Sequence, residues 1–175
     1  MQVPQGVDVK IDGHIVRVKG PKGELVRTFH PDVSVTREDG TLVVSRKDDA
    51  KATRALHGLT RALLQNMVTG VTNGYARDLE ISGTGYRAVL AGKKLQLALG
   101  FSHPIGIDPP AGVSFALETP QKVKVSGTDK QMVGEMAARI RALRVPDPYK
   151  AKGIKYAEER IKKKAGKAGK VGAKA

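Results

Sequence analysis

The sequence contains no cysteine and no tryptophan, and aromatic residues make up only 4% of its 175 residues. The absence of cysteine excludes disulfides, thiolate nucleophiles and cysteine-ligated metal sites. No apolar run approaches the ~20 residues that span a bilayer, and the residues after Met1 lack the pattern of a signal peptide. We therefore expect a soluble, cytoplasmic protein with an aliphatic core and no membrane association.

Acidic residues are scarce at the C-terminal end. Residues 149–175 contain ten lysines and arginines against two acidic residues, whereas residues 1–148 contain 21 against 15. A nearly balanced body followed by a basic, Gly- and Ala-rich tail is typical of nucleic-acid-binding proteins. We expect the low-complexity end, residues 164–175, to be disordered in the free protein.

One segment imitates a catalytic motif. Residues 83–88 (GTGYRA) match the dinucleotide fingerprint G-x-G-x-x-A. That fingerprint requires a following helix whose N-terminus binds pyrophosphate, but the alternation around Val89 and the turn at Gly92 predict a strand. We interpret the segment as a glycine bend between strands. A nucleotide-dependent enzyme is the alternative, and a helix after Tyr86 would favour it.

The remaining polar residues offer no catalytic or metal site. The four histidines are far apart in sequence: His14, His30, His57 and His103. Asp48 and Asp49 adjoin a predicted helix start, where acids favour the helix dipole. Glu158 and Glu159 are expected to pair with lysines on a helix surface. We predict no catalytic residues, no metal and no cofactor.

The chain shows an internal duplication. Positions in the first half recur about seventy or eighty residues later in this order: Val9 with Leu79, Ile11 with Ile81, Gly13 with Gly83, Leu25 with Leu95, Asp49 with Asp129, and residues 61–63 with 141–143. The ten-residue difference falls in the Pro- and Gly-rich stretch 102–112, interpreted as a loop insertion. Each half has several strands followed by one helix, which favours duplication over chance.

Alternating hydrophobicity predicts paired antiparallel strands: 15–19 with 24–29, 33–36 with 42–45, 87–90 with 95–99, and 113–117 with 122–125. The first helix is predicted over about residues 49–68, with an apolar stripe of Leu56, Leu59, Leu63 and Met67. The second is predicted to begin at a capping box over residues 128–131 and to end before Pro146, with an apolar face of Val133, Met136, Ile140 and Leu143.

These patterns predict an α+β fold of two duplicated small domains, each an antiparallel sheet covered by one helix, plus a basic C-terminal tail. The expected domains are residues 1–74 and 75–148, and the extension is residues 149–175. At about 75 residues each half is marginal alone, so we expect the halves to share an interface.

The start of the extension, residues 149–156 (YKAKGIKY), interleaves lysines with two tyrosines. Lysines neutralise phosphates, and tyrosines can stack on unpaired bases. We interpret Gly153 as a position where the main chain approaches a polyanion closely. The segment therefore predicts nucleic-acid binding.

The chain resembles the bacterial large-subunit ribosomal protein six family. The resemblance rests on separate blocks in the same order: residues 146–154 (PDPYKAKGI), 18–25 (VKGPKGEL), 57–61 (HGLTR), 83–88 (GTGYRA), 99–104 (LGFSHP) and 126–131 (SGTDKQ). Two departures stand out. Ala151 occupies a position that is usually Gly, a mild change if its φ is negative, and no basic arm precedes Val3, which leaves open whether the chain is trimmed.

The resemblance implies a structural component of the large ribosomal subunit that binds ribosomal RNA near the factor-binding centre and the stalk base. The implied partners are large-subunit ribosomal RNA, neighbouring ribosomal proteins and nearby translation factors. The nominated RNA-binding residues are Tyr149, Lys150, Lys152, Gly153, Lys155, Tyr156, Arg160, Lys162, Lys163, Lys164, Ser102, His103, Lys130, Lys93 and Lys94. The alternative in the binding class is a non-specific, chromosome-associated DNA-binding protein.

Overall fold

The computed structural model describes residues 1–38 and 40–166. Its contacts divide the chain into two compact units. The first comprises Met1–Tyr75 together with Gly127–Gln131, and the second comprises Ala76–Ser126 together with the chain from Met132 onward. The predicted disorder of the C-terminal end falls largely on residues 167–175, which lie outside the described residues.

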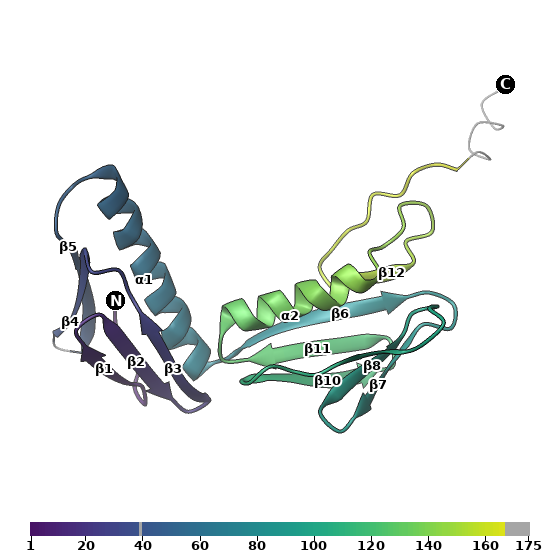
Figure 1. Cartoon of the computed structure of the whole chain (residues 1–175), viewed down its shortest axis with the longest axis horizontal. Helices are drawn as coiled ribbons and strands as arrows, with labels where there is room; N and C mark the ends of the chain where they lie inside the picture. Colours follow the sequence, from purple (N-terminus) through teal and green to yellow (C-terminus); the bar gives the residue numbers. More distant parts are fainter. Residues whose placement is uncertain (39, 167–175) are drawn as a thin grey trace. The chain divides into compact units, whose positions relative to one another are not determined.

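The first unit is built from two small sheets and one helix (Figure 1). Its elements are β1 (Asp8–Asp12), β2 (Ile15–Gly20), β3 (Gly23–Thr28), β4 (Val33–Glu38), β5 (Thr41–Arg46) and α1 (Lys51–Thr72). Strands β1, β2 and β3 form one antiparallel sheet, and β4 pairs with β5. Both predicted strand pairs of the first half are confirmed.

Helix α1 confirms the predicted apolar stripe in part: Met67 is buried, and Leu63 packs partly buried against the core. Leu59, expected on the apolar face, is 53% exposed, whereas Thr60 and Leu64 are buried. The buried face continues through Met67 and Val71. The predicted and the observed stripes both have helical spacing and share Met67, so hydropathy alone could not select between them.

The second unit repeats the element order of the first and adds to it. Its elements are β6 (Tyr75–Ser82), β7 (Arg87–Ala91), β8 (Lys94–Ala98), β9 (Ile105–Ile107), β10 (Val113–Thr119), β11 (Lys122–Gly127), α2 (Lys130–Leu143) and β12 (Gly153–Tyr156). The strands form one sheet of order β7-β8-β9 and another of order β10-β11-β6-β12, along which α2 lies (Figure 1). The α+β fold and the duplication are confirmed.

Two loop predictions meet different outcomes. Strand β7 follows residues 83–86 directly, so the glycine bend is confirmed and no helix presents its N-terminus there. The insertion at residues 102–112 is not only loop, because its apolar residues Ile105 and Ile107 form β9 against β8. Within the described parts of the chain, no helix is long and apolar enough to cross a membrane.

Helix α2 begins one residue later than its predicted capping box requires. The backbone N–H of Gln131 donates to Asp129 Oδ1 at 2.8 Å, so Asp129 and not Thr128 is the cap. The Gln131 side chain does not close a box but accepts a hydrogen bond from Arg27. The predicted capping box is therefore wrong, because a cap must immediately precede the first helical residue, which is Lys130.

The start of the basic extension is a strand of the second unit. β12 pairs antiparallel with β6, with Ile154 opposite Ile81, and Ile154 is fully buried. The extension is thus integrated into the sheet as far as Tyr156. Glu158 and Glu159, expected on a helix surface, lie in irregular chain after β12.

Candidate nucleic-acid interface

A tight loop after α2 displays the first residues of the basic segment. The Asp147 carboxylate accepts from the Lys150 N–H at 2.8 Å, and the Asp147 carbonyl accepts from the Ala151 N–H at 2.8 Å. The Asp147 N–H in turn donates to the Lys152 carbonyl at 2.9 Å. These bonds fix the backbone, so that Lys150 and Tyr149 are exposed, Tyr149 by 55%.

Ala151 occupies a strained backbone conformation at the end of this loop. Its φ is 58°, in the left-handed region, and it is the one such non-glycine residue in the described chain. The sequence expectation of a mild departure depended on a negative φ, and that condition is not met. An L-residue there carries a cost of roughly 1–2 kcal/mol.

Gly153 is glycine because of packing inside the protein. The residue is buried, with φ of 144°. A Cβ atom at this position would lie 2.7 Å from both the Arg144 carbonyl oxygen and the Pro146 Cα. The interpretation that Gly153 admits a polyanion to the main chain is therefore replaced by a structural one: the residue lets β12 pass beneath the loop.

Two further loops of the second unit contact this segment. Lys152 Nζ donates to Thr84 Oγ1 at 3.2 Å, which joins it to the glycine bend. The Arg144 guanidinium lies 5.4 Å from the centre of the Phe101 ring. Ser102 and His103 follow Phe101, are exposed, and contact each other through Oγ and Nδ1 at 3.2 Å. Residues 83–86, 101–103 and 144–152 thus form one loop cluster.

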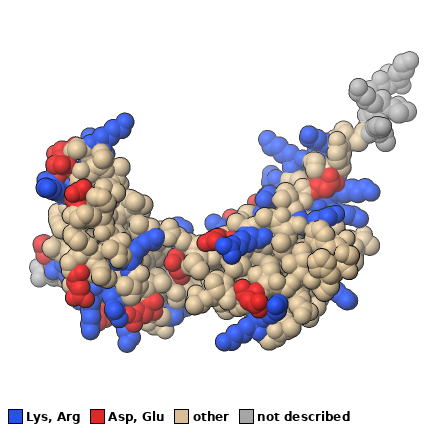
Figure 2. Space-filling view, in the orientation of Figure 1, with Lys and Arg blue, Asp and Glu red and all other residues tan. Residues whose placement is uncertain are grey.

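The chain after β12 returns to this loop cluster. The Lys164 N–H donates to the Pro148 carbonyl at 2.9 Å. Arg160, Lys162, Lys163 and Lys164 are all exposed, and in the described residues none of them forms an ion pair. Figure 2 shows blue side chains gathered over this C-terminal part of the second unit. We call residues 157–164 the returning segment. The returning segment and the loop cluster together form a basic surface.

Two nominated residues of β12 are engaged within the protein. Lys155 Nζ lies 2.7 Å from Glu80 Oε2, its neighbour across the β12–β6 pair. The hydrogen bond from Lys155 lowers the pKa of Glu80, against the opposing effect of desolvation. Tyr156 is half-buried, and the Arg141 guanidinium lies 5.7 Å from its ring centre. Both side chains are thus held by contacts within the second unit.

Three nominated lysines lie outside the loop cluster. Lys130 belongs by its contacts to the first unit, where its Nζ lies 5.7 Å from the Tyr75 ring centre and 3.4 Å from Asn66 Oδ1. Lys93 is exposed at the tip of the β7–β8 hairpin, and Lys94 pairs with Asp108 at 3.2 Å. Sequence reasoning did not nominate Arg144 or Thr84, although Thr84 lay within a block that carried the family resemblance.

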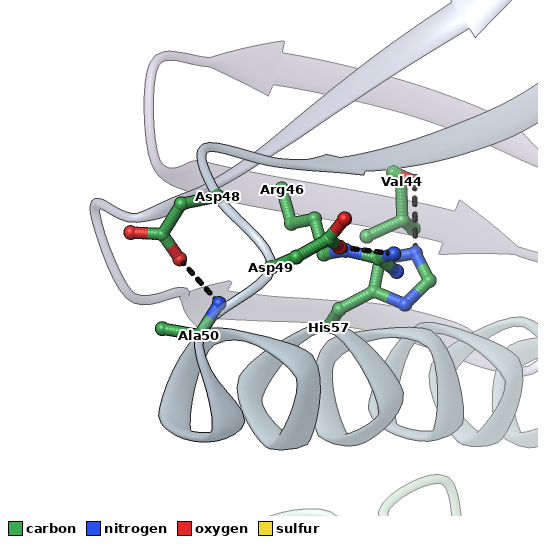
Figure 3. Close-up of polar contacts among 6 residues, drawn as sticks. All are labelled: Val44, Arg46, Asp48, Asp49, Ala50 and His57. Carbon is green, nitrogen blue, oxygen red and sulfur yellow. Dashed lines mark hydrogen bonds and ion pairs between the residues drawn. The ribbon is translucent and has the colours of Figure 1, made fainter.

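The polar residues at the start of α1 have a structural role (Figure 3). Asp48 Oδ1 accepts from the Ala50 N–H at 3.1 Å, and Asp49 accepts from Arg46 Nε at 2.6 Å. Hydrogen bonds from Thr53 and Ala50 lower the pKa of Asp48. His57 Nε2 lies 3.0 Å from the Val44 carbonyl oxygen. These contacts join β5 to α1, and His57 provides one of them.

The protein consists of two α+β repeats, and loops of the second repeat present an exposed basic surface. The fold is therefore that of a duplicated protein, and the charge distribution is that of a nucleic-acid-binding protein. A family model described as Ribosomal protein L6 matches residues 3–74 and 82–157. The chain belongs to the ribosomal protein L6 family, as the sequence resemblance indicated.

Curated relatives agree over nearly the whole chain. A protein of Desulforamulus reducens named large ribosomal subunit protein uL6 is 58% identical over 172 residues, 98% of this chain and 94% of the relative. The proteins of that name from Carboxydothermus hydrogenoformans and Acidothermus cellulolyticus are 53% and 57% identical, over 98% and 96% of this chain and 94% of each relative. The similarity therefore includes both repeats and the basic segment.

Proposed function

We propose that this chain is a non-enzymatic structural constituent of the large ribosomal subunit and binds ribosomal RNA through the basic surface of its second unit. The observation that carries the proposal is the group of exposed cations that hydrogen-bonded loops hold in fixed positions. The relatives named large ribosomal subunit protein uL6 support the ribosomal setting. The resemblance further suggests a location near the factor-binding centre and stalk base, beside neighbouring ribosomal proteins.

The basic surface suits RNA because its charges are both unneutralised and oriented. Contacts to phosphate position a protein on nucleic acid, and structured RNA is recognised mainly by shape and backbone. The Asp147 hydrogen bonds fix the backbone of Lys150, and the Thr84 contact orients Lys152. A rigid set of cations loses less conformational entropy on binding than a flexible tail.

The proposed contact residues fall into three groups. Direct phosphate or base contacts are assigned to Tyr149, Lys150, Lys152, Arg160, Lys162, Lys163, Lys164, Ser102, His103 and, in addition, Arg144. Gly153, Lys155 and Tyr156 support these residues from β12. Lys130, Lys93 and Lys94 are proposed as separate, smaller contacts.

The test is a salt-titrated competition between large-subunit ribosomal RNA and duplex DNA of similar charge, using the full chain and the double variant Lys150→Ala/Lys152→Ala. Removing one phosphate contact reduces the slope of log K against log salt by about 0.7–0.9. The matched control is Lys10→Ala/Lys19→Ala, which removes the same charge from exposed positions of the first unit.

A preference for ribosomal RNA that survives high salt and falls only in the Lys150/Lys152 variant supports the proposal. An unchanged slope in that variant contradicts the assignment of these lysines. Equal affinity for both polymers, collapsing with salt, would establish a general polyanion binder and favour the DNA-binding alternative. Substitutions are preferred over a chain ending at Pro148, because that truncation removes β12 from the sheet.

A further inference from the structure

An ion pair near the start of the returning segment has a bidentate geometry, which is unusual for a contact at the surface. Arg141 Nε donates to Glu159 Oε2 at 2.8 Å, and Arg141 Nη2 donates to Oε1 at 2.6 Å. The two side chains are 28% and 24% exposed. Such bidentate pairs fix orientation as well as charge. The neighbouring Glu158 is 87% exposed and lies 3.7 Å from Arg77.

The same carboxylate closes the turn that ends β12. Glu159 Oε2 also accepts from the Tyr156 N–H at 3.2 Å, and the Glu159 N–H donates to the Tyr156 carbonyl at 3.0 Å. The Arg141 guanidinium lies over the Tyr156 ring. Hydrogen bonds from Arg141 lower the pKa of Glu159, so the carboxylate is ionised at neutral pH. Helix α2 therefore holds this turn through Arg141.

The turn fixes the starting position of the chain segment that carries the next cations. Residues 160–164 run from Glu159 to the loop after α2, where the Lys164 N–H bonds the Pro148 carbonyl at 2.9 Å. The segment is thus attached at both ends, and its exposed side chains Arg160, Lys162 and Lys163 lie between the attachments. Releasing the Glu159 end would leave their charge unchanged and remove their fixed course.

We propose that Arg141 and Glu159 form a positioning pair for RNA binding, so that the negatively charged Glu159 strengthens the binding of a polyanion. The inference rests on the proposed function. From net charge alone, removing a carboxylate from a basic surface should raise the affinity for RNA. The positioning pair predicts the opposite change, a fall in affinity.

The experiment measures the affinity of the full chain for large-subunit ribosomal RNA over a salt series with Glu159→Gln and the matched control Glu158→Gln, which changes net charge identically. We expect Glu159→Gln to bind roughly fourfold more weakly near 0.2 M salt for each phosphate that the segment no longer reaches, with the slope reduced by about 0.7–0.9 per phosphate. Glu158→Gln should bind as tightly as the unmodified chain or more tightly. A role confined to folding would lower the active fraction without changing the slope.

A second pair of variants leaves the net charge of the protein unchanged. Glu159→Asp keeps the charge but shortens the side chain, so it should also weaken binding, whereas Glu158→Asp should have no effect. This pair decides the question if circular dichroism shows that Glu159→Gln does not fold. Arg141→Lys, which keeps the charge and loses the fork, should weaken binding as well.

Tighter or unchanged binding by both Glu159 variants would overturn the positioning pair while leaving the ribosomal proposal intact. Absence of any preference for ribosomal RNA in the unmodified chain would overturn the ribosomal proposal and this inference with it. The two failures are therefore distinguished by the unmodified protein.

Discussion

The two repeats share an order of elements but differ in the chain segments after the helix. After α1 ends at Thr72, β6 begins at Tyr75. After α2 ends at Leu143, the chain forms the Asp147 loop, adds β12 to the sheet and returns along residues 157–164. The second repeat also gains β9 within its insertion. The duplicated unit is thus a scaffold, and the candidate site lies mainly on segments present only in the second copy, with Thr84 contributed by a loop that both copies share, as is common for function carried on loops.

Ion pairs neutralise part of the charge in both repeats. In the first unit, Arg17, Arg37 and Arg46 each lie within ion-pair distance of a carboxylate, whereas the exposed Lys10 and Lys19 form no ion pair among the described residues. In the second unit, the pairs Arg141–Glu159 and Lys155–Glu80 lie at the root of the basic segment, whereas its outer cations at residues 160–164 form no ion pair in the described chain. Acidic residues there stabilise the structure without cancelling the charge available to a ligand.

The largest effect is expected from a substitution in β12, the strand that the second repeat has in addition, because it should destabilise the second repeat and not the first. Ile154→Ala deletes a fully buried side chain of β12 and should destabilise the second unit by about 2–5 kcal/mol. Amide hydrogen exchange should show reduced protection in β6 and β12 while α1 keeps its own. The control Val145→Ala, at a position that is 56% exposed, should change stability by less than about 0.5 kcal/mol. An equal reduction of protection in α1 would show that the repeats unfold as one unit.

The next effect tests whether Gly153 is required by packing. Gly153→Ala places a Cβ atom 2.7 Å from the backbone of Arg144 and Pro146 and should cost about 1–3 kcal/mol in urea unfolding. Gly134→Ala is the control, since nothing lies within 4 Å of a Cβ there, and alanine should stabilise α2 by about 0.5–1 kcal/mol. Similar stability of the two variants would contradict the packing explanation.

A smaller effect of opposite sign is expected two residues earlier. Ala151→Gly relieves the left-handed backbone with φ of 58° and should stabilise the second unit by about 1 kcal/mol. Ala157→Gly, at an exposed position with negative φ, should destabilise it, because glycine increases the entropy of the unfolded chain. Chemical denaturation of both variants checks the prediction, and a destabilising Ala151→Gly would refute it.

The smallest effect concerns pH. Because the pKa of Glu80 and Glu159 is lowered in the folded state, the stability they contribute is complete above the ordinary glutamate pKa of about 4.3 and is lost as pH falls through their lower folded values. Unfolding measured at neutral pH and near pH 3 should show a smaller acid-induced destabilisation in Glu80→Gln than in the unmodified chain. Equal destabilisation would mean that the Lys155–Glu80 pair contributes nothing to this dependence. Asp48 in the first unit has the same sign, but it is exposed and its contribution should be smaller.

The alternation of apolar residues was sufficient to predict four strand pairs, two helices and the duplication, because side-chain periodicity follows from backbone geometry. The basic composition of residues 149–164 likewise indicates nucleic-acid binding there, which stays a prediction. Both are local properties of the chain.

The rest depended on contacts between distant residues. Alternation in the segment around Ile154 is too short to indicate that it completes a sheet with Ile81, and no local pattern distinguishes Leu59 from Leu64 as the buried leucine of α1. Lys152 and Lys155 belong to the same basic segment, and the sequence does not distinguish them. In the structure, Lys152 contacts Thr84 in the loop cluster, whereas Lys155 is paired with Glu80. Which cations stay available to a ligand is set by the partners that folding brings beside them, and such partners are separated by about seventy residues of chain.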